Sequence, residues 1–214
     1  KKPLVIFRYP TAVAGYLVPS ALLICANDGT RGDEVARRLR ISANRFRFWQ
    51  NGVKPPSKPP KMTREEFIEQ FKLKTTPDSP WVISCSRLSS WKRIDRIFNA
   101  VKICLEMDQI VHLLIAGDGP EKRNLQNLDS ELGSDEHVSW MGAIAHDKIW
   151  ALMNLADVFM ITNDVTNRCN PIYEAAWAGL PVVSVVDPST KDLLIHGKNA
   201  LLSRKEDPDA LGGN

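Results

Sequence analysis

Two cations frame a short polar stretch, SRLSSWK, at positions 86–92. Arg87 and Lys92 lie five residues apart, directly after a run at 82–86 that is typical of a buried strand. At the carboxyl end of a parallel strand both side chains can reach the mouth of the sheet, where a forked guanidinium and a compact ammonium suit a diphosphate. A basic turn exposed to solvent is the alternative that the spacing alone allows.

A second candidate is a carboxylate in a βαβ unit. The apolar runs at 158–161 and 180–186 predict two buried strands, and Pro171 suits the first turn of a helix predicted at 172–178. Ligands of such units bind beyond the carboxyl ends of the strands. Glu174 is expected in the first helical turn, where the helix dipole favours a carboxylate and the preceding amides can face an anion. The alternative is that Glu174 is an ordinary helical glutamate with no binding role.

The elements that position these residues alternate regularly from position 81 onward. Strands that alternate with helices at this spacing predict an α/β fold, a doubly wound parallel sheet of the Rossmann-like kind with helices on both faces. The loop at 117–120, GDGP, permits close backbone approach, which a tight turn explains as well as a ligand does. The predicted strands are 82–86, 111–116, 137–141, 158–161, 180–186 and 200–203, and the predicted helices lie at about 94–105, 121–132, 149–156, 172–178 and 191–195.

The first fifty residues form a separate, partial α/β segment. Apolar runs at 4–7 and 21–26, a helical pattern at 32–39 and a strand pattern at 45–49 indicate two βα repeats. The following KPPSKPP at 54–60 excludes helix and central strand, and so predicts an extended linker. Thr63 and Glu66 then form the capping box of a new helix. The tail from position 204 is polar and expected to fray.

Composition narrows the classes of function. The chain has 214 residues, 43% hydrophobic and 25% charged, with a net charge of +3 that is too small and scattered for a nucleic-acid partner. The four cysteines show no paired spacing, which favours reduced thiols and a cytoplasmic location. No signal peptide is seen, and the apolar stretch at 12–26 is too short to span a bilayer. No dinucleotide fingerprint, P-loop or metal-ligand cluster is present, so neither a cofactor nor a metal is expected.

Histidine and tryptophan residues give weaker signals. Each of the four histidines is interpreted as structural or solvated, with His146 beside a predicted helix start. The tryptophans fall mostly on apolar faces and are expected in the core; Trp91, inside the cationic turn, is the candidate exception. The residues concerned are His112, His137, His146 and His196, and Trp49, Trp81, Trp91, Trp140, Trp150 and Trp177.

Taken together, these features resemble the nucleotide-sugar-binding half of a retaining GT-B glycosyltransferase. The family is the glycosyl transferases group 1, family 4, which includes sucrose synthase-like and lipid mannosyl transferases. Matching segments occur in the family's order: Arg87-Leu88 with Lys92; GDGP at 117–120; VSWMG at 138–142; ADVF at 156–159; and EA at 174–175 with AGLPVV at 178–183.

The resemblance also implies a domain organisation. Residues 1–53 would be a remnant of the N-terminal acceptor-side domain, 54–62 the Pro-rich linker, and 63–214 the C-terminal donor-binding domain. FRFWQNGV at 46–53 resembles the last strand of the acceptor-side domain and its turn. Because the first residue is not methionine, we expect that part of a longer chain is missing.

The resemblance assigns roles to the charged residues. Arg87 and Lys92 would clamp the donor diphosphate and stabilise the leaving nucleoside diphosphate without a metal. Glu174 would hold the ribose hydroxyls.

Backbone groups would complete the donor site. The chain around Gly142 and Ala143 would meet the base, and amides near Asn170 and Ile172 would face phosphate or sugar.

One departure from the family pattern concerns the donor sugar. Thr166 occupies the position, eight residues before the ribose-binding glutamate, where the family usually has a second glutamate. The glycine-rich turn that normally follows is replaced by NRCNP, in which Pro171 removes one amide donor. Asp164 or Asn170 is a candidate substitute. Arg168 adds a third cation, interpreted as an exposed loop residue.

The expected function is transfer of a sugar from a UDP- or GDP-sugar to an unknown sugar, lipid or small-molecule acceptor, with retention. The fragment alone is expected to be inactive. Peripheral association with a membrane stays open, because many members of the family glycosylate lipids. The alternatives are a non-catalytic nucleotide-binding or interaction module on the same fold and a sugar-nucleotide epimerase.

Overall fold

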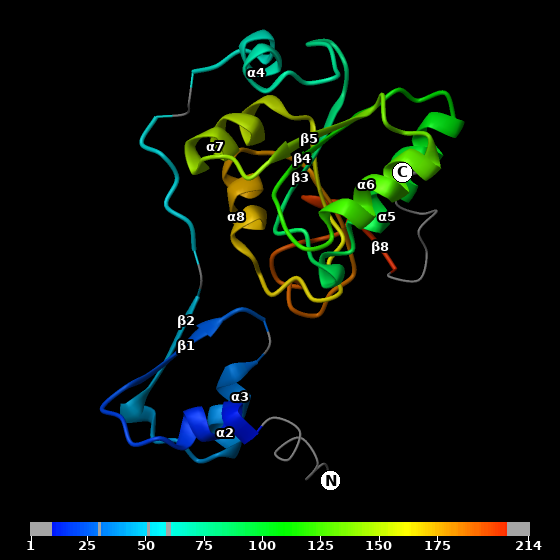
Figure 1. The fold of residues 1–214 in the computed structure, drawn as a ribbon. Helices are drawn as coiled ribbons and strands as arrows, with labels where there is room; N and C mark the ends of the chain where they lie inside the picture. Colours follow the sequence, from blue (N-terminus) through cyan, green and yellow to red (C-terminus); the bar gives the residue numbers. More distant parts are fainter. Residues whose placement is uncertain (1–9, 30, 51, 59–60, 205–214) are drawn as a thin grey trace. The chain divides into compact units, whose positions relative to one another are not determined.

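The computed structural model describes residues 10–29, 31–50, 52–58 and 61–204 (Figure 1). The chain divides into two compact units, 1–52 and 53–214. The predicted strand at 4–7 and nearly all of the polar tail lie outside the described residues.

The first unit is a small parallel α/β arrangement. Strands β1 (Leu23–Asn27) and β2 (Phe46–Gln50) pair from Leu23 opposite Phe46 to Asn27 opposite Gln50. Helix α3 (Gly32–Arg38) connects them, as expected from a strand–helix–strand crossover. Helix α2 (Pro10–Leu17), which the sequence analysis did not predict, precedes β1.

The second unit begins with a capped helix. Residues 52–58 contain no helix or strand, and α4 (Arg64–Phe71) starts after Thr63. The Glu66 amide donates to Thr63 Oγ1 over 3.2 Å, while the Thr63 amide donates to Glu66 Oε2 over 2.8 Å. This confirms the predicted capping box. The fully buried Phe67 packs against Phe71 and Trp81, with ring centroids 4.6 and 6.2 Å away, and so joins α4 to the sheet.

A six-stranded parallel sheet forms the centre of the second unit. The strands lie in the order β5-β4-β3-β6-β7-β8, so the chain runs outward in one direction from β3 and in the other from β6. This confirms the predicted doubly wound sheet and places its topological switch point between β3 and β6. The strands are β3 (Trp81–Cys85), β4 (His112–Ala116), β5 (Val138–Gly142), β6 (Val158–Ile161), β7 (Val182–Val185) and β8 (Ala200–Ser203).

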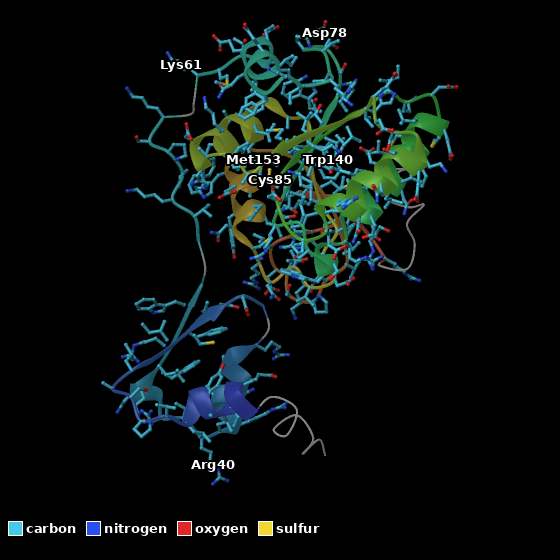
Figure 2. The ribbon with its side chains drawn as sticks, in the orientation of Figure 1. Arg40, Lys61, Asp78, Cys85, Trp140 and Met153 are labelled. Atoms are coloured by element: carbon cyan, nitrogen blue, oxygen red, sulfur yellow. The ribbon has the colours of Figure 1, made fainter. Side chains whose placement is uncertain are left out.

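Helices cover the two faces of this sheet (Figure 1). One apolar cluster contains residues of α4, α7 and α8, and the other contains residues of α5 and α6. Figure 2 shows Cys85 of β3 and Met153 of α7 within the interior of the first cluster. The helices are α5 (Ile94–Glu106), α6 (Lys122–Leu132), α7 (His146–Leu155) and α8 (Asn170–Trp177).

Two expectations about local structure were wrong. Residues 188–193 form turns, and the helix predicted at 191–195 is absent. The Asp187 carboxylate accepts a hydrogen bond from the Ser189 amide over 2.8 Å, which favours a local turn over a helix. Trp49 and Trp177 were expected in the core but are 59% and 65% exposed, whereas Trp81 and Trp150 are buried as expected.

Candidate functional site

A cavity of about 250 Å³ opens at the carboxyl edge of the sheet. Its lining includes the last residues of β3 and β4, the loop after β5, and the first half of α8. Three of the predicted site residues, Arg87, Ala143 and Glu174, lie in this lining together. The full lining is Cys85, Ser86, Arg87, Ala116, Gly117, Asp118, Ala143, Ile144, His146, Ile149, Pro171 and Glu174.

The two glycines of GDGP are explained by contacts within the chain. A Cβ on Gly117 would lie 1.8 Å from the carbonyl oxygen of Ser86, and one on Gly119 would lie 2.2 Å from that of Leu88. Gly117 also has φ +154°, which L side chains rarely adopt. The close approach that the sequence permits is therefore to the loop that carries Arg87.

Backbone hydrogen bonds fix that loop further. The Leu88 amide donates to the Asp118 carbonyl over 3.0 Å, and the Glu121 amide donates to the Leu88 carbonyl over 3.1 Å. On the other side, the Gly117 amide donates to the Gly142 carbonyl over 2.7 Å. The loops after β3, β4 and β5 are thus held together by main-chain groups.

Arg87 and Lys92 have contrasting environments. Arg87 is exposed at the cavity, whereas Lys92 is only 7% exposed and is not part of the cavity lining. Lys92 Nζ lies 4.1 Å from the Trp91 ring centroid. With the Asn163 amide oriented so that its oxygen faces the ammonium, Lys92 Nζ donates to that oxygen over 3.2 Å. Burial lowers the pKa of the Lys92 ammonium, and negative charge on Cys169, just before α8, would act in the opposite direction.

Glu174 lies deeper in the structure than the sequence indicated. Helix α8 begins at Asn170, so Glu174 is its fifth residue rather than part of the first turn, and the expectation from the helix dipole was wrong. Its side chain is 5% exposed, and Oε1 lies 2.7 Å from His146 Nε2. Its carboxylate also adds to the effect of burial in raising the pKa of the Cys85 thiol above its ordinary value.

His146 is a residue of the site that sequence reasoning missed. It is the first residue of α7, 65% exposed, and lines the cavity. Its position soon after β5 was the available signal, because the carboxyl ends of parallel strands meet at one edge.

The predicted backbone contacts are only partly available. Gly142 has φ +67° and ends β5, and the exposed Ala143 follows it at the cavity. Asn170 is exposed at the first position of α8, where an amide has no intrahelical acceptor. The side chain of Ile172 is fully buried and its amide donates to the Cys169 carbonyl over 3.1 Å.

The loop after β6 departs from expectation at Arg168. This residue was interpreted as exposed, but it is 8% exposed and donates to the Ser189 carbonyl over 2.8 Å and to Asp192 over 2.9 Å. The polar turn at 187–192 supplies these acceptors, which the sequence did not show. Arg168 therefore joins two loops and does not extend into the cavity.

Thr166, at the position of the missing glutamate, and Asp164, one of its two candidate substitutes, are also engaged in contacts within the protein. Thr166 is buried, and its amide donates to Asp187 Oδ2 over 2.6 Å. Asp164 forms ion pairs with Arg93 and Arg96 at 3.4 and 3.0 Å. Both residues therefore contribute to the internal structure of the loop.

A larger cavity of about 590 Å³ lies at the opposite edge of the sheet. Its lining includes Val158, Val182 and Ala200, the first residues of β6, β7 and β8, and is mostly apolar. Among the described residues of that lining, only Lys198 is charged. The smaller cavity, where charges of both signs converge at the carboxyl edge, is the better candidate for chemistry.

The described residues contain no group of three or more histidine, cysteine, aspartate or glutamate side chains arranged to hold a metal. Within the same residues, no helix has the length and apolar character needed to cross a bilayer. The described residues include all four cysteines, and none of these forms a disulfide.

Two curated glycosyltransferases are similar to this chain in sequence. The chain is 28% identical over 152 residues to a GDP-mannose-dependent alpha-(1-6)-phosphatidylinositol monomannoside mannosyltransferase of Mycobacterium tuberculosis, covering 68% of this chain and 39% of that protein. It is 27% identical over 194 residues to the lipopolysaccharide core biosynthesis glycosyltransferase LpsE of Rhizobium meliloti, covering 91% and 52%. The chain thus spans about half or less of the length of these curated relatives.

Solved structures show the same fold. Anabaena HepE in complex with UDP-glucose superposes with a TM-score of 0.73 at 22% identity, covering 96% of this chain and 56% of that one. Sucrose-phosphate synthase from Thermosynechococcus elongatus superposes with a TM-score of 0.72 at 20% identity, covering 96% of this chain and 50% of that one. The family described as glycosyl transferases group 1 matches residues 65–213. The chain therefore belongs to the glycosyl transferases group 1 family.

Proposed function

We propose that this chain is the donor-binding part of a retaining glycosyltransferase, which moves a sugar from a UDP- or GDP-sugar to an acceptor. The observation that carries the proposal is the convergence of Arg87, Ala143 and Glu174 on one cavity at the carboxyl edge of the sheet. Ligands of doubly wound sheets bind at this edge. Family membership supports the reaction class.

Arg87 and Lys92 are proposed to stabilise the diphosphate. Arg87, exposed at the cavity, can present a bidentate fork to phosphate oxygens. Lys92 is buried, so its charge acts through a medium that screens it less than water does. Together they would neutralise the nucleoside diphosphate as it leaves, which requires no metal.

Glu174 is proposed to accept hydrogen bonds from the ribose hydroxyls, and the chain at Gly142 and Ala143 to meet the base. Asn170 offers its amide at the start of α8. The amide of Ile172 is already used by Cys169, and Pro171 has none. Because α8 offers fewer free amides than a glycine-rich turn would, Arg87 carries a larger share of phosphate binding.

Residues 1–53 are proposed to be a remnant of the acceptor-side domain, 54–62 a linker, and 63–214 the donor domain. A transferase needs groups that position the acceptor as well as the donor. We therefore expect this chain to bind donor without transferring sugar. The acceptor, a cytoplasmic location and any peripheral membrane association belong to this proposal.

A second candidate, a non-catalytic nucleotide-binding module, is favoured by one observation. Thr166, which replaces the usual glutamate, is buried and bonded to Asp187. No carboxylate therefore occupies that position to contact a donor sugar. This candidate predicts nucleotide binding without turnover even when the acceptor-side domain is complete.

Calorimetric titration with UDP, GDP and ADP tests the proposal. One nucleotide should bind. Arg87→Ala and Glu174→Ala should each lower its affinity at least about tenfold, which corresponds to roughly 1.4 kcal/mol of binding free energy. Arg123→Ala and Glu131→Ala, exposed on α6, are the matched controls and should bind normally. Equal binding by all four variants would refute the site.

Retention is tested separately, in a complete protein with its acceptor. The anomeric configuration of the product, measured by NMR, should match that of the donor sugar. Absence of any transfer alongside normal nucleotide binding would favour the non-catalytic candidate.

A further inference from the structure

We infer that His146 is a positioning residue for Glu174, and that it aims this carboxylate at the ribose of a ribonucleoside diphosphate. The inference rests on the proposed function. His146 and Glu174 come from different helices, α7 and α8, and their side chains meet at the cavity.

The buried carboxylate depends on one partner. Glu174 is 5% exposed, and its contact with His146 is the only side-chain hydrogen bond found for it among the described residues. A carboxylate removed from water is strongly disfavoured unless it is paired or hydrogen-bonded. The imidazole supplies the hydrogen bond that a carboxylate at this depth requires.

The proton on the imidazole can be assigned by chemistry. An ionised carboxylate only accepts hydrogen bonds, so His146 Nε2 donates to Glu174 Oε1 over the 2.7 Å that separates them. This engages one carboxylate oxygen. Oε2 keeps its lone pairs for hydroxyl groups of a ligand in the cavity.

The imidazole is itself held in place. Its ring lies edge-on to Trp150, one helical turn further along α7, with centroids 6.0 Å apart. Trp150 is buried, and the start of α7 is fixed by the Ile149 amide, which donates to the Ala145 carbonyl over 3.1 Å. A largely exposed side chain is thus oriented by a buried one, as positioning requires.

The test compares nucleotides with and without the ribose diol. UDP and GDP, with their 2′,3′-dideoxy counterparts, are titrated into the wild-type chain and into His146→Ala, His146→Gln, Glu174→Ala and the double variant His146→Ala/Glu174→Ala. Circular dichroism confirms that each variant is folded.

We expect His146→Ala to lower the affinity for the ribonucleotide about tenfold. The affinity for the dideoxy nucleotide should stay unchanged. His146→Gln, whose amide can donate from a similar position, should restore most of the affinity. The double variant should bind no more weakly than Glu174→Ala, because the two residues act as a unit.

Other results would overturn the inference. Suppose that the wild type binds the ribonucleotide and that His146→Ala either binds it equally well or loses affinity for the dideoxy nucleotide to the same extent as for the ribonucleotide. In either case His146 does not position Glu174, and the proposed function survives. If the wild type binds neither UDP nor GDP, the proposed function fails and this inference fails with it.

Discussion

Two groups of loops meet at the carboxyl edge of the large sheet, and they are held by different means. The β3–β5 loops (86–93, 117–121 and 143–145) are joined by main-chain hydrogen bonds such as that from Gly117 to Gly142. The β6–β7 loops (162–169 and 186–192) are joined by side chains, chiefly Arg168 and Asp187. Lys92, at the end of the first group, reaches Asn163 in the second.

The difference shows where each group tolerates change. Main-chain contacts survive most substitutions but fail where a glycine is required, as at Gly117 and Gly119. Side-chain contacts depend on the identity of each partner. Substitutions at the two groups should therefore have effects of different kinds and sizes.

Gly117→Ala should have the largest effect. The new methyl group would overlap the Ser86 carbonyl, and φ +154° is strained for alanine, so we expect a loss of about 3 kcal/mol in the free energy of unfolding. Chemical denaturation measures it. Gly133→Ala is the control, because its Cβ would meet nothing within 4 Å and only φ +68° is unfavourable; it should lose about 1 kcal/mol. Equal losses would argue against the close approach at Ser86.

Arg168→Met should have the next largest effect. It leaves the Ser189 carbonyl without its buried donor, which should lower the free energy of unfolding by about 2 kcal/mol. The ion pair with Asp192 should add little, because that carboxylate is 64% exposed. Arg123→Met, on the exposed face of α6, provides the comparison and should change stability by less than about 0.5 kcal/mol. No difference between these variants would mean that Arg168 does not join the loops.

Asp187→Asn should change the dependence of stability on pH. Burial opposes ionisation of Asp187, but the amides of Ser189 and Thr166 outweigh it, so the pKa of the folded protein lies below the ordinary value of about 3.9. A lowered pKa stabilises the fold above the unfolded pKa, and this contribution is lost as pH falls through the folded pKa. Wild type should therefore lose stability more steeply than Asp187→Asn from about pH 5 downward. Chemical denaturation at a series of pH values measures this. If the free energy of unfolding fell equally with pH in both proteins, the role of the carboxylate would be contradicted.

Lys92→Met should have the smallest effect on stability. Burial lowers the pKa of Lys92, so its charge costs folding free energy at neutral pH, and removing it should change stability by less than about 1 kcal/mol. Nucleotide affinity should nevertheless fall at least about tenfold if Lys92 serves the diphosphate. A large loss of stability with normal binding would make Lys92 a structural bridge between the loop groups.

The features that were predicted correctly are those that a local sequence pattern determines. Strand positions, the capping box at Thr63 and the glycine loop at 117–120 follow from periodicity and turn chemistry, and each was found. The sequence did not predict Arg168, whose acceptor Ser189 lies twenty-one residues away in the next loop. The pairing of His146 with Glu174 across twenty-eight residues was missed for the same reason. Contacts between loops depend on the assembled sheet edge, which no local pattern contains.

Hydrogen–deuterium exchange of the chain with and without UDP and GDP tests most directly where the donor binds. Protection should increase at 85–88, 116–118, 142–149 and 170–174, around the smaller cavity that Arg87 and Glu174 line. It should not change at 193–201, beside the larger apolar cavity at the opposite edge. Protection confined to 193–201 would contradict the assignment of nucleotide binding to the carboxyl edge of the sheet.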